Sequence, residues 1–151
     1  LLEARGFTAE QFAFSHPGGS LGRRLLLKVK TIMHCGSQIP QVSKSTLVKD
    51  ALLEMTQKGL GMTTVVDDKG QLLGIFTDGD LRRTLDKDLD FHTTQVCDVM
   101  TKSCASIHPE KLAAEALQIM EEKKINAIVA IEDGLLVGVL NMHDLLRAGV
   151  I

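Results

Sequence analysis

The chain has 151 residues, of which 44% are hydrophobic and 24% charged, and its formal net charge is -2. These values are typical of globular domains, and no apolar run is long enough for a membrane span. The negative net charge and the scarcity of aromatic residues (3%) disfavour nucleic-acid binding, which needs a clustered positive face or stacking surfaces. We therefore expect neither a nucleic-acid partner nor a membrane partner.

The cysteines Cys35, Cys97 and Cys104 form no C-x-x-C pair and show no zinc-binding spacing with histidine. We expect reduced thiols in a cytoplasmic protein, and no metal site. The chain opens on Leu1-Leu2-Glu3, which is neither an initiator methionine nor a signal-peptide pattern. We interpret the sequence as part of a longer protein.

Residues 1–29 combine a short amphipathic helix, expected over residues 8–14, with a glycine-rich loop. The loop reads Ser15-His16-Pro17-Gly18-Gly19-Ser20-Leu21-Gly22 and precedes the basic pair Arg23-Arg24. Glycines allow a backbone to approach a ligand closely, so this loop could cradle a phosphate. Taken alone, the segment is interpreted as a linker.

From Thr31 onward the chain contains two copies of one unit. Matching stretches at the start, in the middle and at the end of the unit carry the repeat: Ile32-Met33 with Val99-Met100, Asp50-Ala51-Leu52 with Glu115-Ala116-Leu117, and Gly74-Ile75-Phe76-Thr77 with Gly138-Val139-Leu140-Asn141. A unit this short buries little surface by itself, so the two copies are expected to pack together.

In copy one, a strand over residues 39–42 leads to a helix with Ser45-Thr46 as the expected N-cap. Gly59 and Gly61 are expected to end that helix. A hairpin follows, with strands at 63–66 and 72–76 joined by the turn 67–70, and a second helix is expected over residues 81–85. The apolar stripe of the first helix consists of Leu47, Ala51, Leu52 and Met55.

Copy two follows the same order after the polar bridge 86–95. Its first strand is expected at 105–107, Pro109 marks the expected helix start, and the hairpin strands fall at 127–131 and 135–140. The sequence thus predicts β-α-β-β-α twice, in the α+β or α/β class, with the two repeats packed as a pseudo-twofold pair. The apolar stripe of its first helix consists of Leu112, Ala116, Leu117 and Met120.

This repeated unit, with its G-h-h-T-x-x-D ending (h, hydrophobic), resembles the cystathionine-β-synthase (CBS) domain, whose tandem pair is called a Bateman module. The resemblance extends from Thr31 to Val150 and divides the chain into CBS domains at residues 30–88 and 89–151. It implies a homodimer formed through the CBS pairs.

Three stretches are also similar to the D-arabinose-5-phosphate isomerase family: Phe14 to Leu25, Thr77 to Arg83 and Met142 to Gly149. That family joins a sugar-isomerase (SIS) domain to two CBS domains, forms larger homo-oligomers and feeds synthesis of the lipopolysaccharide sugar Kdo. Residues 1–29 would then be the tail of the SIS domain and its linker. The resemblance makes His16 catalytic in the parent enzyme but inert here, because its SIS-domain partners are absent. We do not expect these 151 residues to be an enzyme on their own.

In CBS domains that hold nucleotides, the residue matching Thr77 meets the phosphate and the one matching Asp80 accepts from the ribose hydroxyls. The alternative is that Thr77-x-x-Asp80 is a capping box, in which each side chain satisfies a backbone N–H of the same helix. Copy two offers Asn141-x-x-Asp144, which keeps the carboxylate and replaces the hydroxyl by an amide. We expect a phosphate to bind better at Thr77 than at Asn141.

The resemblance also places the nucleotide base between the first strand and the start of the second. That assigns Val42, Met62 and Thr63 in copy one, and Asn126, Ala127 and Ile128 in copy two. Arg83 could supply charge to a phosphate, and His143 could donate to an anion. The alternatives are that Met62 fills the core and that Arg83 and His143 face solvent.

The interpretation favoured by the sequence is a regulatory module that senses a nucleotide or nucleotide sugar and needs no cofactor. The candidate ligands are CMP-Kdo, CMP, AMP and ATP. The alternative is a purely structural dimerisation module without a ligand.

Overall fold

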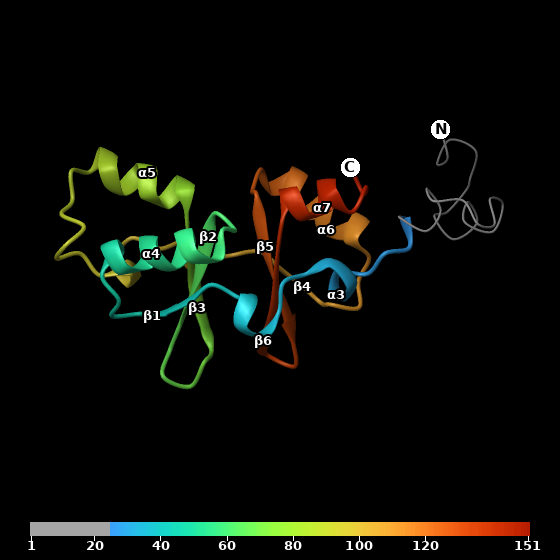
Figure 1. Ribbon diagram of the computed structural model, residues 1–151, viewed down its shortest axis with the longest axis horizontal. Coiled ribbons are helices and arrows are strands. Elements are labelled where there is room, and N and C mark those ends of the chain that lie inside the picture. The colour runs from blue at the N-terminus through green and yellow to red at the C-terminus, as the bar shows by residue number, and fades with distance from the viewer. Residues whose placement is uncertain (1–24) are drawn as a thin grey trace.

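The computed structural model describes residues 25–151 as two sheets, each covered by helices on one side (Figure 1). His16 and the predicted SIS tail up to residue 24 lie outside the described residues. A short helix, α3 (Val29–Ile32), and a 3-10 turn, η2 (Gly36–Gln38), come first. The first repeat then contains β1 (Gln41–Ser43), α4 (Val48–Lys58), β2 (Met62–Val66), β3 (Leu72–Thr77) and α5 (Asp78–Asp86).

A second 3-10 turn, η3 (Val96–Asp98), leads to the second repeat, which contains β4 (Ser106–Ile107), α6 (Ala113–Lys123), β5 (Ala127–Glu132), β6 (Leu135–Asn141) and α7 (Met142–Arg147). The predicted order β-α-β-β-α is confirmed in both copies. Among the helices of residues 25–151, none combines the length and the apolar character needed to cross a bilayer.

Both sheets have the same topology and nearly the same register. Strand β1 runs parallel to β2, with Val42 opposite Val65, and β2 runs antiparallel to β3, with Thr64 opposite Ile75. In the second sheet, β4 pairs in parallel with β5, which runs antiparallel to β6. Each hairpin has a register irregularity near its turn, after Val65 and after Ala130. The internal repeat in the sequence is therefore also a repeat in structure.

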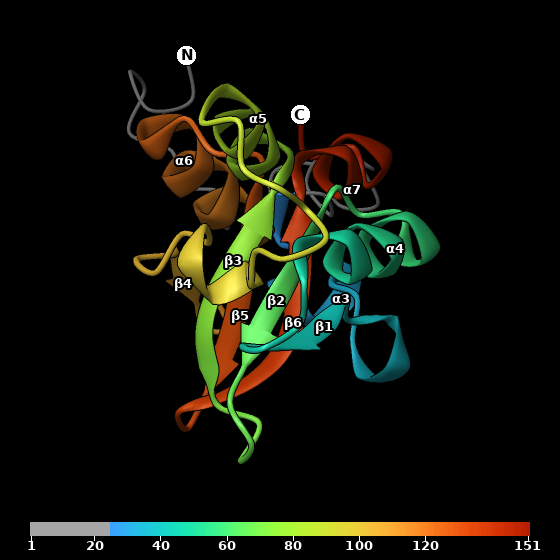
Figure 2. The ribbon, with the colours of Figure 1, turned by 90° about the vertical axis from the view of Figure 1, so that its left-hand side faces the viewer.

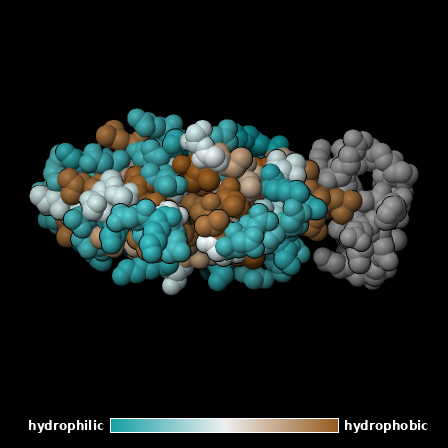
Figure 3. Space-filling model, turned by 90° about the horizontal axis from the view of Figure 1, so that it is seen from below, coloured by the Kyte–Doolittle hydropathy of each residue, from teal (hydrophilic) through white to brown (hydrophobic). Residues whose placement is uncertain are grey.

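The two sheets stack on one another, with β2 and β3 in front of β5 and β6 in Figure 2. The apolar cluster between them draws on both repeats, which confirms sheet-to-sheet packing. Where the two repeats meet, hydrophobic side chains also gather on the face seen in Figure 3. The buried members of the cluster are Ile39, Met62, Ile75, Ala127, Val129 and Val139.

Two predicted helix starts were wrong. The N-cap of α4 is Leu47, because the hydroxyls of Ser43 and Thr46 bond one another at 3.0 Å in the preceding turn. Helix α6 begins at Ala113, after Pro109 has already turned the chain. The Pro109 carbonyl accepts from the backbone N–H of Lys30, so this proline belongs to a docking loop.

The predicted end of α4 was correct, because Gly59 adopts φ +70 at the C-cap. Helix α5 starts at Asp78, earlier than predicted, because Thr77 caps it. Since Leu47 and Leu112 are N-cap residues, the buried helix faces differ from the predicted stripes. Those faces consist of Val48, Ala51 and Met55 on α4, and Ala113, Ala116 and Met120 on α6.

Each repeat is completed by a segment that precedes the other repeat. We call residues 27–34 the first lead-in and residues 96–101 the second lead-in. The first lead-in packs into the core of repeat two through Val29, and the second packs into the core of repeat one through Val96. Their ends pair with the central part of a strand: His34 exchanges backbone hydrogen bonds with Val139, and Thr101 with Ile75. Figure 1 shows α3 beside the sheet of repeat two accordingly.

Each lead-in passes close to the middle of a strand, and this crossing requires a glycine there: Gly74 on β3 and Gly138 on β6. A Cβ at Gly74 would lie 2.5 Å from the Thr101 carbonyl oxygen, and one at Gly138 would collide with the Met33 side chain. Both glycines have ordinary backbone angles, so the reason is space and not conformational freedom. Two matching motifs in the sequence therefore mark two matching close approaches.

Candidate ligand-binding cleft

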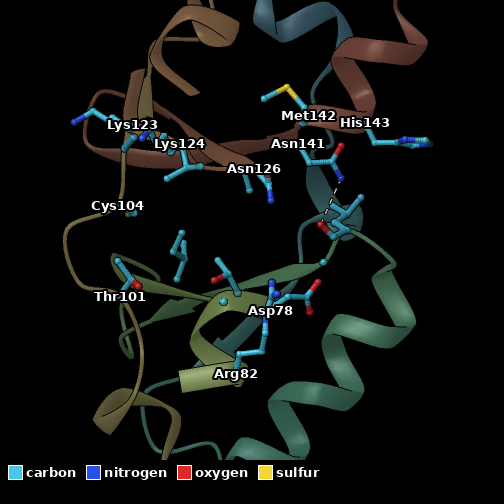
Figure 4. Close-up of a pocket in the computed structure, with 18 of the residues that line it drawn as sticks. Asp78, Arg82, Thr101, Cys104, Lys123, Lys124, Asn126, Asn141, Met142 and His143 are labelled. Atoms are coloured by element: carbon cyan, nitrogen blue, oxygen red, sulfur yellow. Dashed lines mark hydrogen bonds between the residues drawn. The ribbon is translucent and has the colours of Figure 1, made fainter. Parts of the chain in front are cut away.

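A cleft of about 850 Å³ lies between the two repeats, where both strand-to-helix turns meet. One wall is formed by the β3–α5 turn, and the opposite wall by the end of α6 with the β6–α7 turn (Figure 4). The lining residues used below are Leu60, Gly61, Thr77, Asp78, Gly79, Arg82, Arg83, Cys104, Lys123, Lys124, Asn126, Ala127, Asn141 and His143.

The β3–α5 turn is held by a complete capping box. The Asp80 N–H donates to Thr77 Oγ1 at 3.3 Å, and the Thr77 N–H donates to Asp80 Oδ2 at 2.9 Å. Asp80 Oδ1 also accepts from the hydroxyl of Thr101 at 2.7 Å and from the guanidinium of Arg83. Asp80 is only 2% exposed. Its carboxylate is therefore saturated by protein donors beneath the cleft.

The β6–α7 turn repeats this arrangement with changed partners. The Asp144 N–H donates to Asn141 Oδ1 at 2.8 Å, and the Asn141 N–H donates to Asp144 Oδ2 at 2.9 Å. Arg147 donates to Asp144 Oδ1 at 2.6 Å, and His34 Nε2 lies 2.8 Å from the same oxygen. The Asn141 amide also donates to the Leu60 carbonyl across the cleft at 3.4 Å, drawn as a dashed line in Figure 4.

The structure brings half of the predicted site residues to the cleft. Thr77 and Arg83 line its first wall, and the second wall holds Asn126, Ala127, Asn141 and His143. Asp80 and Asp144 lie beneath the turns, buried at 2% and 5% exposure. Capping is therefore present at both turns, as the structural alternative required.

The remaining predicted residues lie away from the lining for packing reasons. Met62 belongs to the cluster between the sheets, and Ile128 lies in the core of repeat two. The buried Thr63 donates its hydroxyl to the Thr64 carbonyl at 3.1 Å. Val42 packs against the core of repeat one. These four strand residues thus point into the cores, and the cleft is formed by loops, helix ends and the strand ends at Thr77, Ala127 and Asn141.

Several lining residues were not predicted. Asp78, Gly79 and Arg82 belong to the first turn of α5 or follow it directly, and Lys123 and Lys124 end α6. The sequence offered one signal that could have identified these residues, namely their proximity to Thr77 and Asn126. Cys104 also lines the cleft, and burial raises the pKa of its thiol, so it remains protonated and weakly nucleophilic.

The cleft carries a positive surplus although the whole chain is net negative. Four basic side chains line it, and Asp78 is the only acidic one among the lining residues. Arg83 is paired with Asp80, whereas Arg82, Lys123 and Lys124 form no ion pair within residues 25–151. Unpaired cations around a cleft with capped helix starts favour a small anionic ligand.

Two stacked β-α-β-β-α units around a shared cleft define a tandem-repeat module. The chain belongs to the CBS domain family, which matches residues 29–87 and 96–151. It is 62% identical to arabinose 5-phosphate isomerase KdsD of Pseudomonas aeruginosa, over 99% of this chain and 46% of that protein. The chain thus spans about half the length of the curated relatives it matches.

Two solved structures share this fold at less than half that identity. An uncharacterized conserved protein from Pyrococcus horikoshii superposes with a TM-score of 0.75 at 28% identity, covering 83% of this chain and 93% of that one. CBSX2, solved in complex with AMP, superposes with a TM-score of 0.69 at 26% identity, covering 82% and 96% of the two chains. The predicted resemblance to CBS domains is confirmed.

Proposed function

We propose that this chain is the nucleotide-sensing CBS pair of a D-arabinose-5-phosphate isomerase, which converts ribulose 5-phosphate to arabinose 5-phosphate for Kdo synthesis. The observation that carries the proposal is the positively charged cleft between the two capped turns. The similarity to KdsD over nearly the whole chain supports the parent enzyme, and the AMP complex of CBSX2 supports a nucleotide ligand. The three free thiols are consistent with a cytoplasmic location.

The first wall suits the phosphate of such a ligand. Helix α5 presents its first backbone N–H groups there, and Gly79 lines the cleft beside them without a side chain. Arg82, which forms no ion pair within residues 25–151, adds a positive charge on the same wall. Phosphate oxygens accept readily from this combination of donors.

The ribose hydroxyls of the ligand need a carboxylate acceptor on the same wall. Asp78 is exposed in the cleft, whereas both oxygens of Asp80 already accept from Thr77, Thr101 and Arg83. We therefore assign the hydroxyl contact to Asp78. Asp80 positions the turn that carries it.

Calorimetric titration with CMP-Kdo, CMP, AMP and ATP tests the proposal. At least one ligand should bind in the micromolar range or tighter, and Arg82→Glu should weaken it by about tenfold or more, since one charge contact is worth over 1 kcal/mol. Lys87→Glu reverses an exposed charge at the far end of α5 and should leave the affinity unchanged. Absence of heat from all four ligands would overturn the sensing function.

A dimerisation module is the second candidate, because several helices leave large apolar side chains exposed. Leu53 on α4, Leu85 on α5 and Leu146 on α7 are 61%, 57% and 55% exposed. Analytical ultracentrifugation of the wild type and of Leu53→Gln/Leu85→Gln tests this candidate. A purely structural module predicts a dimer that the double variant dissociates, together with no nucleotide binding in either protein.

A further inference from the structure

The second wall of the cleft carries its own pair of cations, opposite the phosphate wall. Lys123 and Lys124 end helix α6 and line the cleft, while Asp78 and Arg82 lie across from them (Figure 4). Neither lysine forms an ion pair with any carboxylate of residues 25–151. Asn126 adds an amide group to this wall, whereas the Asn141 amide already bonds Asp144 and Leu60. It therefore offers charge and hydrogen bonds that a phosphate on the α5 side does not use.

The backbone of Lys124 gives an independent observation. Lys124 adopts the left-handed conformation at φ +55 as the C-cap of α6, whereas the equivalent C-cap of α4 is Gly59 at φ +70. Glycine takes this conformation without steric cost, and a lysine does not. A lysine is therefore held in a strained position in the one copy where that position lines the cleft, a pattern typical of functional residues.

Helix capping does not account for this choice. A cation in the last turn of a helix interacts favourably with its carbonyl ends, but Lys123 already supplies one to α6, as Lys58 does to α4. Copy one combines that lysine with a glycine cap, and the same combination would serve copy two. Lys124 adds a further charge, and it lines the cleft.

We propose that Lys123 and Lys124 form a second anion subsite, so that the preferred ligand carries two separate anionic groups, one for each wall. This inference rests on the proposed function, because it concerns the same cleft. The shared chemistry is a nucleoside phosphate extended by a further anion, which is either a phosphate, as in a nucleoside triphosphate, or a carboxylate, as in the nucleotide of an acidic sugar. A nucleoside monophosphate would fill only the first wall.

The test compares three cytidine ligands by calorimetry: CMP with a single phosphate, CTP with additional phosphates, and CMP-Kdo with a carboxylate on its sugar. Lys124→Gly should leave the affinity for CMP within about twofold and weaken CTP, CMP-Kdo or both by about tenfold, the usual scale of one lost charge contact. The ligand that loses affinity identifies the second anion. The melting temperature of Lys124→Gly should equal or exceed that of the wild type, because glycine relieves the backbone strain.

Asp88→Gly is the matched control, because Asp88 also adopts a left-handed conformation, at φ +57, and does not line the cleft. It should change none of the three affinities. Equal weakening of all three ligands by Lys124→Gly, or no weakening at all, would overturn the second subsite while leaving the nucleotide-binding function in place. A lower melting temperature of Lys124→Gly would contradict the strain argument. If none of the three cytidine ligands binds the wild type, the second subsite is overturned, whereas the sensing function fails only if AMP and ATP show no binding either.

Discussion

His34 Nε2 lies 2.8 Å from Asp144 Oδ1, so the first lead-in contacts the buried carboxylate that holds the second turn of the cleft. The equivalent contact in the other half joins the Thr101 hydroxyl to Asp80 Oδ1 at 2.7 Å. Each turn is thus fixed by a segment that precedes the other repeat. A ligand that shifts either turn must also act on the chain that leads into it.

Removal of either contact should destabilise the fold, because a buried carboxylate loses a donor. We expect His34→Ala and Thr101→Val each to lower the free energy of unfolding by about 1–2 kcal/mol. His92→Ala is the control, since the His92 side chain is exposed and makes no hydrogen bond within the described residues. Urea denaturation measures the difference, and wild-type stability in both variants would show that the contacts contribute nothing.

The crossings of the lead-ins predict that Gly74→Ala and Gly138→Ala are destabilising. Each added methyl group would collide with a lead-in, and such overpacking costs about 1–3 kcal/mol. Gly79→Ala provides a comparison at a glycine with free space and an ordinary φ. Thermal melting should rank both sheet variants well below Gly79→Ala. Equal melting temperatures for all three variants would show that the close approach of the lead-ins leaves room for a methyl group.

The two capping residues should matter about equally for stability and unequally for ligand binding. Thr77→Ala and Asn141→Ala each remove a cap worth about 1 kcal/mol. Each variant also loses one further bond, either from the Thr77 hydroxyl to Asp80 Oδ2 at 3.1 Å or from the Asn141 amide to the Leu60 carbonyl at 3.4 Å. For CMP, however, Thr77→Ala should show the larger loss of affinity in calorimetry. Equal losses of CMP affinity in the two variants would refute a phosphate site at Thr77.

Stability at low pH should depend on Glu110, which ties the first lead-in to the loop before α6. Its carboxylate accepts from Lys30 at 2.7 Å and from Lys28 at 3.0 Å, and these bonds lower its pKa to about 2. Because the pKa is lower in the folded state, the contribution is fully present above the ordinary pKa of about 4.3 and is lost as the pH falls toward 2.

In Glu110→Gln, stability should therefore fall less steeply between about pH 4.5 and 2 than in the wild type. The measurement is urea denaturation across that range at low salt, because these groups are exposed and salt screens them. A pH profile unchanged by the substitution would contradict the role of Glu110.

Local pattern predicted the order of elements and the repeat, because turn residues and hydrophobic periodicity act over a few residues. It also pointed to Thr77 and Asn141, since a capping box is a local feature. The exchange of lead-ins was not predictable, because the contact of His34 with Val139 joins distant parts of the chain. Pro109 misled the prediction for the same reason, since it serves a tertiary contact and not a helix start.

The prediction for the strand residues of the site was wrong, because the sequence of a strand does not show which of its two faces is turned toward the ligand. Met62 and Ile128 face apolar clusters, whereas the lysines at the end of α6 reach the cleft. Comparison of the two copies held the missing signal: Lys124 stands where copy one has Gly59. Its strained backbone became visible only in the structure.

Amide chemical-shift mapping during titration with CMP-Kdo tests the central claim most directly, because it locates the ligand without any substitution. If the cleft between the repeats is the binding site, the shifted amides should cluster at Gly61, at residues 77–83, at 123–127 and at 141–143. Shifts at the separate hollow beside α6, lined by Lys111 and Gln118, or no shifts at millimolar ligand, would contradict it.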